Sequence, residues 1–223
     1  AQLPTPNKDY TPQNDPVRKE RPVSVRSSPN IILVMADDLA WMDLACQGNP
    51  LVDTPFLDQF ASEGIRFTSA YAAAPVCSPT RAALITGLAP ARLRITNHIP
   101  DREQFTPAGA SHTGAEMFDF LAPRYTTIAE RLKVAGYTTG FFGKWHIAGT
   151  GIGPQGQGMA QYYPENQGFD VNFGGCIYGG PPTFFDPYRI HNLADRKEGE
   201  YLPDRLADEV CQFIDEADGT PFF

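Results

Sequence analysis

Residues 77–87 read CSPTRAALITG and follow a run of small residues at 70–75. The proline at 79 and the arginine at 81 predict a tight turn that leads into a short helix over 81–86, ending at Gly87. Such a turn places Cys77 where backbone N–H groups and the helix dipole favour negative charge. Arg81, one helical turn further on, can reach back to the same point. The stretch therefore predicts a site that binds an oxyanion and carries out chemistry on it.

The overall composition limits the possible ligands. The chain has 223 residues, of which 42% are hydrophobic, so it is long enough to bury a sizeable core. Its net charge of −8 and its lack of a basic run argue against nucleic-acid binding. An acidic chain that binds an anion must concentrate a few Arg, Lys and His side chains at one place. No apolar run approaches the roughly 20 residues that span a bilayer, so we predict no membrane span.

The cysteine count does not settle the cellular compartment, but the first residue bears on it. The four cysteines lie at positions 46, 77, 176 and 211. If Cys77 is reserved for chemistry, three remain, and at most one disulfide can form. The chain begins at Ala1 rather than at methionine, which fits a chain matured by signal cleavage but also an edited one. We expect a periplasmic or secreted protein.

The first third of the chain predicts an arm followed by a buried strand. Residues 1–29 are polar and proline-rich, which predicts an extended N-terminal arm. Residues 30–36, NIILVMA, form an uninterrupted apolar run that is typical of a strand buried on both faces of a parallel or mixed sheet. The run ends at Asp37 and Asp38, two adjacent carboxylates that need a partner at such a position.

Strands and helices are predicted to alternate along the rest of the chain. Thr54 and Pro55 begin a helix, with Thr54 as the N-cap, an inward apolar stripe and Gly64 at its end. Thr127 and Glu130 form a capping box at the start of another helix. That helix is predicted to end at Gly136, with Ile128, Leu132 and Ala135 inward. Strands are predicted at 65–71, at 137–143 and from Pro221, and an amphipathic helix is predicted at 204–217. The stretch at 169–192 is predicted to be irregular, and residues 88–125 are predicted to form a long excursion with a short helix at 117–121.

This alternation predicts an α/β fold, with a mixed, largely parallel central sheet flanked by helices on both faces. Functional loops of such sheets lie at the carboxyl ends of the strands. Asp37 and Asp38 follow one predicted strand, residues 144–146 follow another, and Cys77 comes soon after a third. We therefore expect these groups to converge at one edge of the sheet.

Three stretches together carry a family resemblance. The CSPTRAALITG stretch resembles the Cys-x-Pro-x-Arg signature of the type I sulfatases, members of the alkaline phosphatase superfamily. Residues 30–39, NIILVMADDL, resemble the opening strand of that family with its metal-binding aspartates, and residues 136–149, GYTTGFFGKWHIAG, resemble its second core motif. The resemblance implies an alkaline phosphatase-like fold. It also implies hydrolysis of sulfate monoesters, with a sulfated carbohydrate or an aryl sulfate as the substrate.

The same resemblance implies the chemistry of the site. A separate formylglycine-generating enzyme would oxidise Cys77 to formylglycine, whose hydrated aldehyde attacks sulfur and then expels sulfate. Asp37, Asp38 and residue 77 would be ligands of Ca²⁺, with Mg²⁺ as an alternative. Arg81 would steady the hydrated aldehyde. Lys144 would bind the sulfate, and His146 would orient or deprotonate a formylglycine hydroxyl.

Substrate-reading residues are predicted from a polar loop. Related sulfatases often place substrate contacts where this chain has residues 92–100, which makes Asn97, His98 and Asp101 candidates for binding sugar hydroxyls. An ordinary polar loop is an equal alternative. His191, with Arg189, is a weaker candidate in a later loop. Residues 151–156, GIGPQG, match a dinucleotide-binding pattern only formally, because they follow no strand and open no helix.

The chain differs from the family in length. Family members are generally about twice as long, and the resemblance implies that a further His, an Asp-Asn pair and another Lys belong to the missing half. We expect residues 30–223 to be the N-terminal part of the catalytic domain, with an open Ca²⁺ site and little activity alone. A separate chain that carries the C-terminal half is a possible partner. Two alternatives stay open: a phosphate or phosphonate monoester hydrolase, and an inactive remnant that binds sulfated glycans or a partner.

Overall fold

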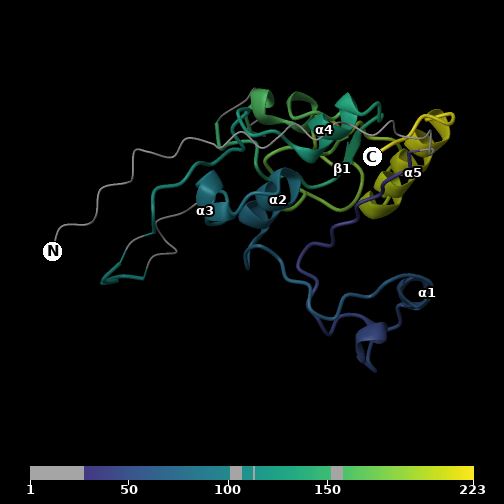
Figure 1. The fold of residues 1–223 in the computed structure, drawn as a ribbon, viewed down its shortest axis with the longest axis horizontal. Coiled ribbons are helices and arrows are strands. Elements are labelled where there is room, and N and C mark those ends of the chain that lie inside the picture. Colours follow the sequence, from purple (N-terminus) through teal and green to yellow (C-terminus); the bar gives the residue numbers. More distant parts are fainter. Residues whose placement is uncertain (1–27, 101–106, 113, 152–157) are drawn as a thin grey trace, which may run out of the picture.

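The computed structural model describes residues 28–100, 107–112, 114–151 and 158–223. Most of the predicted N-terminal arm, Asp101 and most of the GIGPQG stretch therefore lie outside the described residues. Within these ranges the ordered elements are, in chain order, η1 (Ala45–Gln47), α1 (Pro55–Glu63), α2 (Cys77–Thr86), α3 (Pro90–Leu93), α4 (Ile128–Val134), β1 (Gly140–Phe142), η3 (Ala160–Tyr162), η4 (Pro164–Asn166), β2 (Val171–Phe173) and α5 (Leu202–Glu216) (Figure 1).

A small parallel sheet organises the part of the chain that holds the site. β1 pairs in parallel with β2, with Gly140 opposite Val171 and Phe142 opposite Phe173. On its other side, the strand register continues through a parallel bridge between Thr138 and Phe222. The backbone N–H of Ile31 then donates to the carbonyl of Phe222 at 2.8 Å. Residues 221–223 therefore lie beside β1, and the run at 30–36 joins residues 221–223 at Ile31.

The two predicted strands in the first half of the chain are not formed. Residues 30–36 are extended but carry no strand, and Ile32 and Val34 are 61% and 86% exposed. A strand buried on both faces needs a neighbour on each edge and a layer on each face. Among the described residues this run makes one backbone hydrogen bond to a neighbouring strand segment, at Ile31, and its side chains border an apolar cavity. Residues 65–71 form no strand either, and they are exposed throughout.

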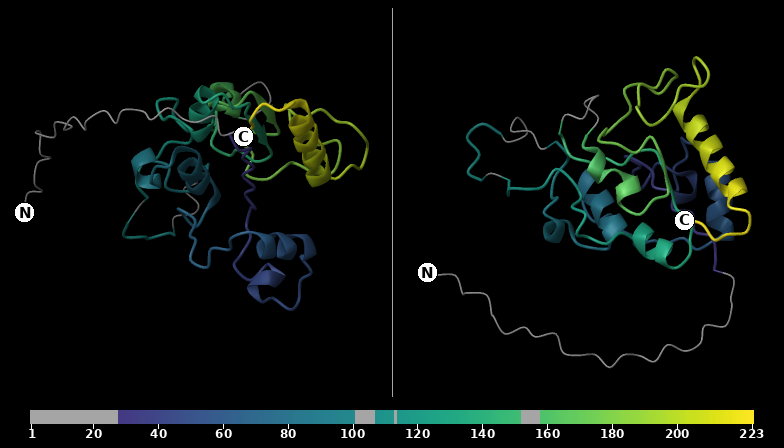
Figure 2. Two further views of the ribbon diagram at one scale, coloured as in Figure 1. Left: turned by 45° about the vertical axis from the view of Figure 1, so that its right-hand side comes forward. Right: turned by 90° about the horizontal axis from the view of Figure 1, so that it is seen from above.

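The first helix forms where expected but does not pack as expected. α1 begins at Pro55 and ends before Gly64, yet Phe56 and Phe60 of its apolar stripe are 85% and 74% exposed. The side chain of Thr54 does not cap the helix. Its hydroxyl instead donates to Asp58 at 2.9 Å and accepts from the backbone N–H of Ala45. Figures 1 and 2 show α1 and η1 projecting together from the rest of the molecule.

Later predictions are confirmed in part. The capping box is present, with the N–H of Glu130 donating to the Thr127 hydroxyl at 3.1 Å. The buried position of α4 is nevertheless Ala129, while Ile128 and Ala135 are exposed. No helix forms at 117–121, because the backbone N–H groups of Phe118 and Leu121 donate to distant carbonyls, those of Arg94 and Ile147.

Helix α5, in the C-terminal half, packs against the sheet at β1. α5 buries Phe213 and half-buries Leu206, Val210 and Ile214, as predicted, and it lies beside β1 (Figure 1). The stretch at 169–192, predicted as irregular, contains β2. Its three residues are too short a run between glycines to give a strand signal. All four cysteines are free, which agrees with the limit of one disulfide.

Candidate active site

The helix that carries the nucleophile candidate begins at that residue. α2 runs from Cys77, not from Arg81 as predicted, because Pro79 is tolerated in the first turn, where the N–H groups have no intrahelical partner. Val76 is the extended N-cap residue, and Gly87 ends the helix in the left-handed conformation with φ 70°. The positive end of a ten-residue helix therefore lies at Cys77.

Two cations converge on Asp37 beside Cys77. Lys144, directly after β1 and its Gly143 turn, donates from Nζ to Asp37 Oδ2 at 2.7 Å and to Cys77 Sγ at 3.2 Å. Arg81 lies 3.2 Å from the other Asp37 oxygen and also donates to the backbone carbonyl of Lys144. Burial raises the pKa of Asp37, but the bonds from Lys144 and Arg81 outweigh it and hold that pKa below its ordinary value. Asp37 is therefore a carboxylate fixed between two cations.

One hydrogen-bond donor of Arg81 has no acceptor among the described residues. The residue is only 8% exposed, and its Nε is buried without a hydrogen-bond partner among the described residues. A buried guanidinium N–H that lacks an acceptor is costly unless a ligand supplies one. An anion bound next to the start of α2 would be such a ligand.

Asp38 completes a carboxylate pair that could hold a metal. It adopts a left-handed backbone with φ 55°, and no ion pair of Asp38 is found within the described ranges. One ligand atom each from Asp37, Asp38 and Cys77 lies within 4.8 Å of the others. Two carboxylates are oxygen ligands of the kind that Ca²⁺ and Mg²⁺ take. The set fits a hard cation, although the described residues supply fewer than the six to eight oxygens of a full Ca²⁺ shell.

His146 is buried and held from two sides. It is 1% exposed and has a left-handed backbone with φ 62°. Its Nε2 is hydrogen-bonded to the backbone carbonyl of Ile99, which leaves the lone pair on Nδ1. The Ser78 hydroxyl lies 3.4 Å from Nδ1 and accepts from the N–H of Ile99 at 3.1 Å. Burial, and after it the charge of Lys144, lowers the pKa of His146 to about 4, so this imidazole is neutral at pH 7.

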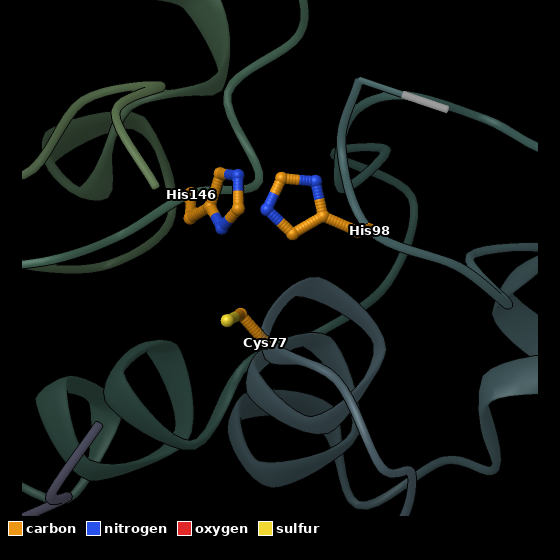
Figure 3. Close-up of side chains that lie close together, drawn as sticks. All are labelled: Cys77, His98 and His146. Atoms are coloured by element: carbon orange, nitrogen blue, oxygen red, sulfur yellow. The ribbon is translucent and has the colours of Figure 1, made fainter. Parts of the chain in front are cut away.

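His98 lies directly against His146. The two rings meet edge to face, with centroids 4.5 Å apart, and Figure 3 shows Cys77 next to both. One ligand atom each from Cys77, His98 and His146 lies within 4.8 Å of the others. His98 Nδ1 is buried and has no hydrogen-bond partner in the described part of the chain. Asn97 is adjacent, and its Oδ1 accepts from the N–H of His98 at 2.9 Å.

The predicted site residues therefore divide into two groups. The structure brings Asp37, Asp38, Cys77, Arg81, Lys144, His98 and His146 into one cluster. His191 instead packs its ring against Tyr163, with centroids 5.1 Å apart. Sequence reasoning did not identify Ser78 or the carbonyl of Ile99 as holding His146. Ser78 is part of the quoted motif, but no pattern links it to residue 99.

The α/β framework thus places a helix start, two cations and a carboxylate pair together, and such a set of groups can bind an anion next to a metal ion. The Sulfatase family model matches residues 29–223, and the chain belongs to this family. The chain is 39% identical over 163 residues to steryl-sulfatase of Rattus norvegicus, an alignment that covers 70% of this chain and 26% of that protein. It is also 39% identical over 161 residues to N-acetylgalactosamine-6-sulfatase of Mus musculus, which covers 72% and 27%.

A solved structure supports the same fold. The crystal structure of Ps i-CgsB in complex with k-i-k-neocarrahexaose matches with a TM-score of 0.66 and 31% identity, covering 87% of this chain and 43% of that one. The α/β, alkaline phosphatase-like fold class predicted from the sequence is therefore confirmed for this part of the fold. The chain spans about a quarter of the length of the two relatives above and under half of this structure.

Proposed function

We propose that the protein hydrolyses sulfate monoesters and that its substrate is a sulfated carbohydrate. The observation that carries this proposal is the convergence of Lys144 and Arg81 on Asp37 beside residue 77, at the start of α2. The carbohydrate is supported by the names of two similar proteins, an N-acetylgalactosamine-6-sulfatase and a protein solved with neocarrahexaose. An aryl sulfate would serve as a model substrate.

Residue 77 would act as formylglycine, whose hydrated aldehyde would supply one hydroxyl as the nucleophile and a second hydroxyl that allows sulfate to be expelled. The chain's own groups then have separate tasks. The start of α2 and the unpartnered Nε of Arg81 attract the sulfate oxygens. Lys144 Nζ lies 3.2 Å from Cys77 Sγ. Its positive charge would therefore lie next to the sulfate group that residue 77 attacks. His146, neutral and oriented by Ile99, can accept a proton at Nδ1.

Asp37 and Asp38 would hold Ca²⁺, or alternatively Mg²⁺, and the ion would add positive charge next to the sulfate. Asp38 is the better placed of the two, because both oxygens of Asp37 already accept from Lys144 and Arg81. A cation would therefore share Asp37 with these two side chains.

Mass spectrometry of residue 77 and parallel assays would test the proposal. The chain is produced together with a formylglycine-generating enzyme and with a polypeptide that carries the C-terminal half, and the complex is assayed with an aryl sulfate and an aryl phosphate in Ca²⁺. We expect formylglycine at residue 77 and a preference for the sulfate. A clear preference for phosphate would instead support a phosphate or phosphonate monoester hydrolase.

Matched variants separate the site from the rest of the surface. Lys144→Ala should lower sulfate turnover by about 10²- to 10³-fold, the usual effect of removing one positioned donor. Lys133→Ala is the control, because Lys133 lies on α4 and pairs with Asp170 and not with the cluster. If both variants behave alike, the assigned role of Lys144 is wrong.

The partners follow from the same proposal. A polypeptide carrying the C-terminal half would complete the site, and its co-purification with sulfatase activity would rule out a non-catalytic remnant. We propose a periplasmic or secreted location and no nucleic-acid partner. Among the described residues, no helix combines the length and apolar character needed to cross a bilayer.

A further inference from the structure

We propose that, while residue 77 is an unmodified cysteine, Cys77, His98 and His146 form a binding site for a borderline-soft divalent cation such as Zn²⁺. This set differs from the carboxylate pair at Asp37 and Asp38, although both sets include Cys77. Sulfur and imidazole nitrogen are the ligands that Zn²⁺ prefers, whereas Ca²⁺ and Mg²⁺ prefer carboxylate oxygens. Figure 3 shows the three side chains gathered around one space.

The distances are compatible with a tetrahedral site after a small adjustment. The three ligand atoms lie within 4.8 Å of one another. With Zn–S of about 2.3 Å and Zn–N of about 2.1 Å, tetrahedral ligand atoms are about 3.3–3.6 Å apart. The side chains must therefore approach by up to about 1.2–1.5 Å, a movement that rotation of the Cys77 and His98 side chains can supply. A fourth position would remain open for water or an anion.

His146 is already held as a metal ligand usually is. Histidine ligands commonly donate their second ring N–H to a backbone carbonyl, which fixes the tautomer and the ring orientation. The Nε2 bond to Ile99 does this, and it leaves the lone pair on Nδ1. In the described part of the chain, the hydrogen-bond contact of Nδ1 is the long one of 3.4 Å to the Ser78 hydroxyl, so a cation would displace little.

His98 presents its other nitrogen to the same space. Figure 3 shows Nε2 of His98 pointing toward His146, whose ring centroid lies 4.5 Å from that of His98. Nε2 is therefore the nitrogen of His98 that would bind the cation. Lys144 Nζ donates to Sγ at 3.2 Å, so a cation bound to the sulfur would displace this hydrogen bond.

The cation site is tied to the chemical state of residue 77. Conversion to formylglycine removes the only sulfur of the set, and two imidazoles alone make a weak Zn²⁺ site. Only this consequence rests on the proposed function; the site itself rests on the cysteine form. Zn²⁺ should therefore bind the chain produced without a formylglycine-generating enzyme and should bind the matured chain far more weakly.

Zn²⁺ titration against a chromophoric chelator tests the site on the full cysteine-form chain. We expect one tight equivalent, with one sulfur and two nitrogen neighbours in X-ray absorption. Cys77→Ser and His98→Gln should each weaken binding by at least about 100-fold, since even partners of metal ligands contribute about 10- to 100-fold. Cys211→Ser and His112→Gln are controls, because both residues are exposed and lie outside the set. Unchanged affinity in Cys77→Ser and His98→Gln, or a zinc spectrum without sulfur, overturns the proposal.

Alkylation provides a readout that needs no variant. Zn²⁺ should protect Cys77 from iodoacetamide while the exposed Cys211 continues to react in the same sample. Equal rates at Cys77 with and without one equivalent of Zn²⁺ contradict the site. This result is separate from the proposed function, because formylglycine formation and sulfate turnover are measured on the matured chain.

Discussion

Ser78 links the helix that carries Cys77 to the support of His146, and its removal should be costly. Both Ser78 and Ile99 are 0% exposed, and the Ser78 hydroxyl accepts the Ile99 N–H at 3.1 Å. Ser78→Ala leaves that buried N–H without an acceptor, which costs about 1–3 kcal/mol. The contact with His146 at 3.4 Å is longer than an ordinary hydrogen bond and adds little. We expect a loss of about 2 kcal/mol in the free energy of unfolding.

Urea unfolding and hydrogen exchange measure this effect. With a urea slope of about 2 kcal/mol per molar, a loss of about 2 kcal/mol lowers the unfolding midpoint by about 1 M. Hydrogen exchange should also show faster exchange at the amide of Ile99, whose bond to Ser78 is lost. Neither measurement requires maturation of Cys77 or a substrate.

Ser62→Ala is the matched control. The Ser62 hydroxyl donates to the carbonyl of Gln59 at 2.7 Å on the exposed surface of α1, so its loss should change stability by no more than about 0.5 kcal/mol. Our reasoning fails if Ser78→Ala unfolds at the same urea concentration as the parent chain. It also fails if the amide of Ile99 keeps its protection in the variant.

Three further predictions concern the scaffold. Thr127→Val should lower the free energy of unfolding by about 2–4 kcal/mol, because it removes the helix cap and the bond to the buried carbonyl of Gln167. Thr127→Ser keeps the hydroxyl and should lower it by only about 1 kcal/mol, and thermal unfolding of the two variants measures the difference. Burial raises the pKa of Asp170, but bonds from Lys133 and Thr139 outweigh it and keep that pKa below 3.8. Asp170→Asn should therefore destabilise at pH 7, and the difference should shrink as the pH falls through the lowered pKa, as unfolding at several pH values would show. Burial raises the pKa of Cys176 to about 11, so iodoacetamide at pH 8 should spare it, and peptide mapping showing its rapid labelling contradicts this.

The residues of the site could be predicted from the sequence because each belongs to a local motif. Asp37 and Asp38 end an apolar run, Lys144 and His146 follow β1, and Cys77 begins α2. These groups lie together, although among the described residues only β1, before Lys144, forms out of the three strands expected to lead into the site.

The support of the site could not be predicted in the same way. The acceptor for His146 is the backbone carbonyl of Ile99, and every residue has such a carbonyl. Its use depends on how residues 94–100 cross the molecule, which no periodicity records. The helix expected at 117–121 failed for a related reason, because long-range bonds to Arg94 and Ile147 replaced the local ones.

The strand predictions show that a local sequence pattern does not decide whether a segment pairs into a sheet. The apolar run at 30–36 has the composition of a central strand, but burial is a property of its neighbours and not of the run itself. Here the run meets the rest of the sheet at Ile31, and Ile32 and Val34 remain exposed. β2 is the converse case, because pairing with β1 makes a strand from three residues that carry no pattern of their own.

The charges of the cluster explain why a metal and an anion would support each other at this site. Arg81 and Lys144 balance Asp37 and Asp38, so the cluster has no net charge before a ligand binds. A sulfate monoester alone would make it negative, with both carboxylates close to the bound anion. A divalent cation on the carboxylates reverses the sign and leaves positive charge where negative charge develops during hydrolysis. Asp37 is central to this balance, because it is the carboxylate that both cations already hold.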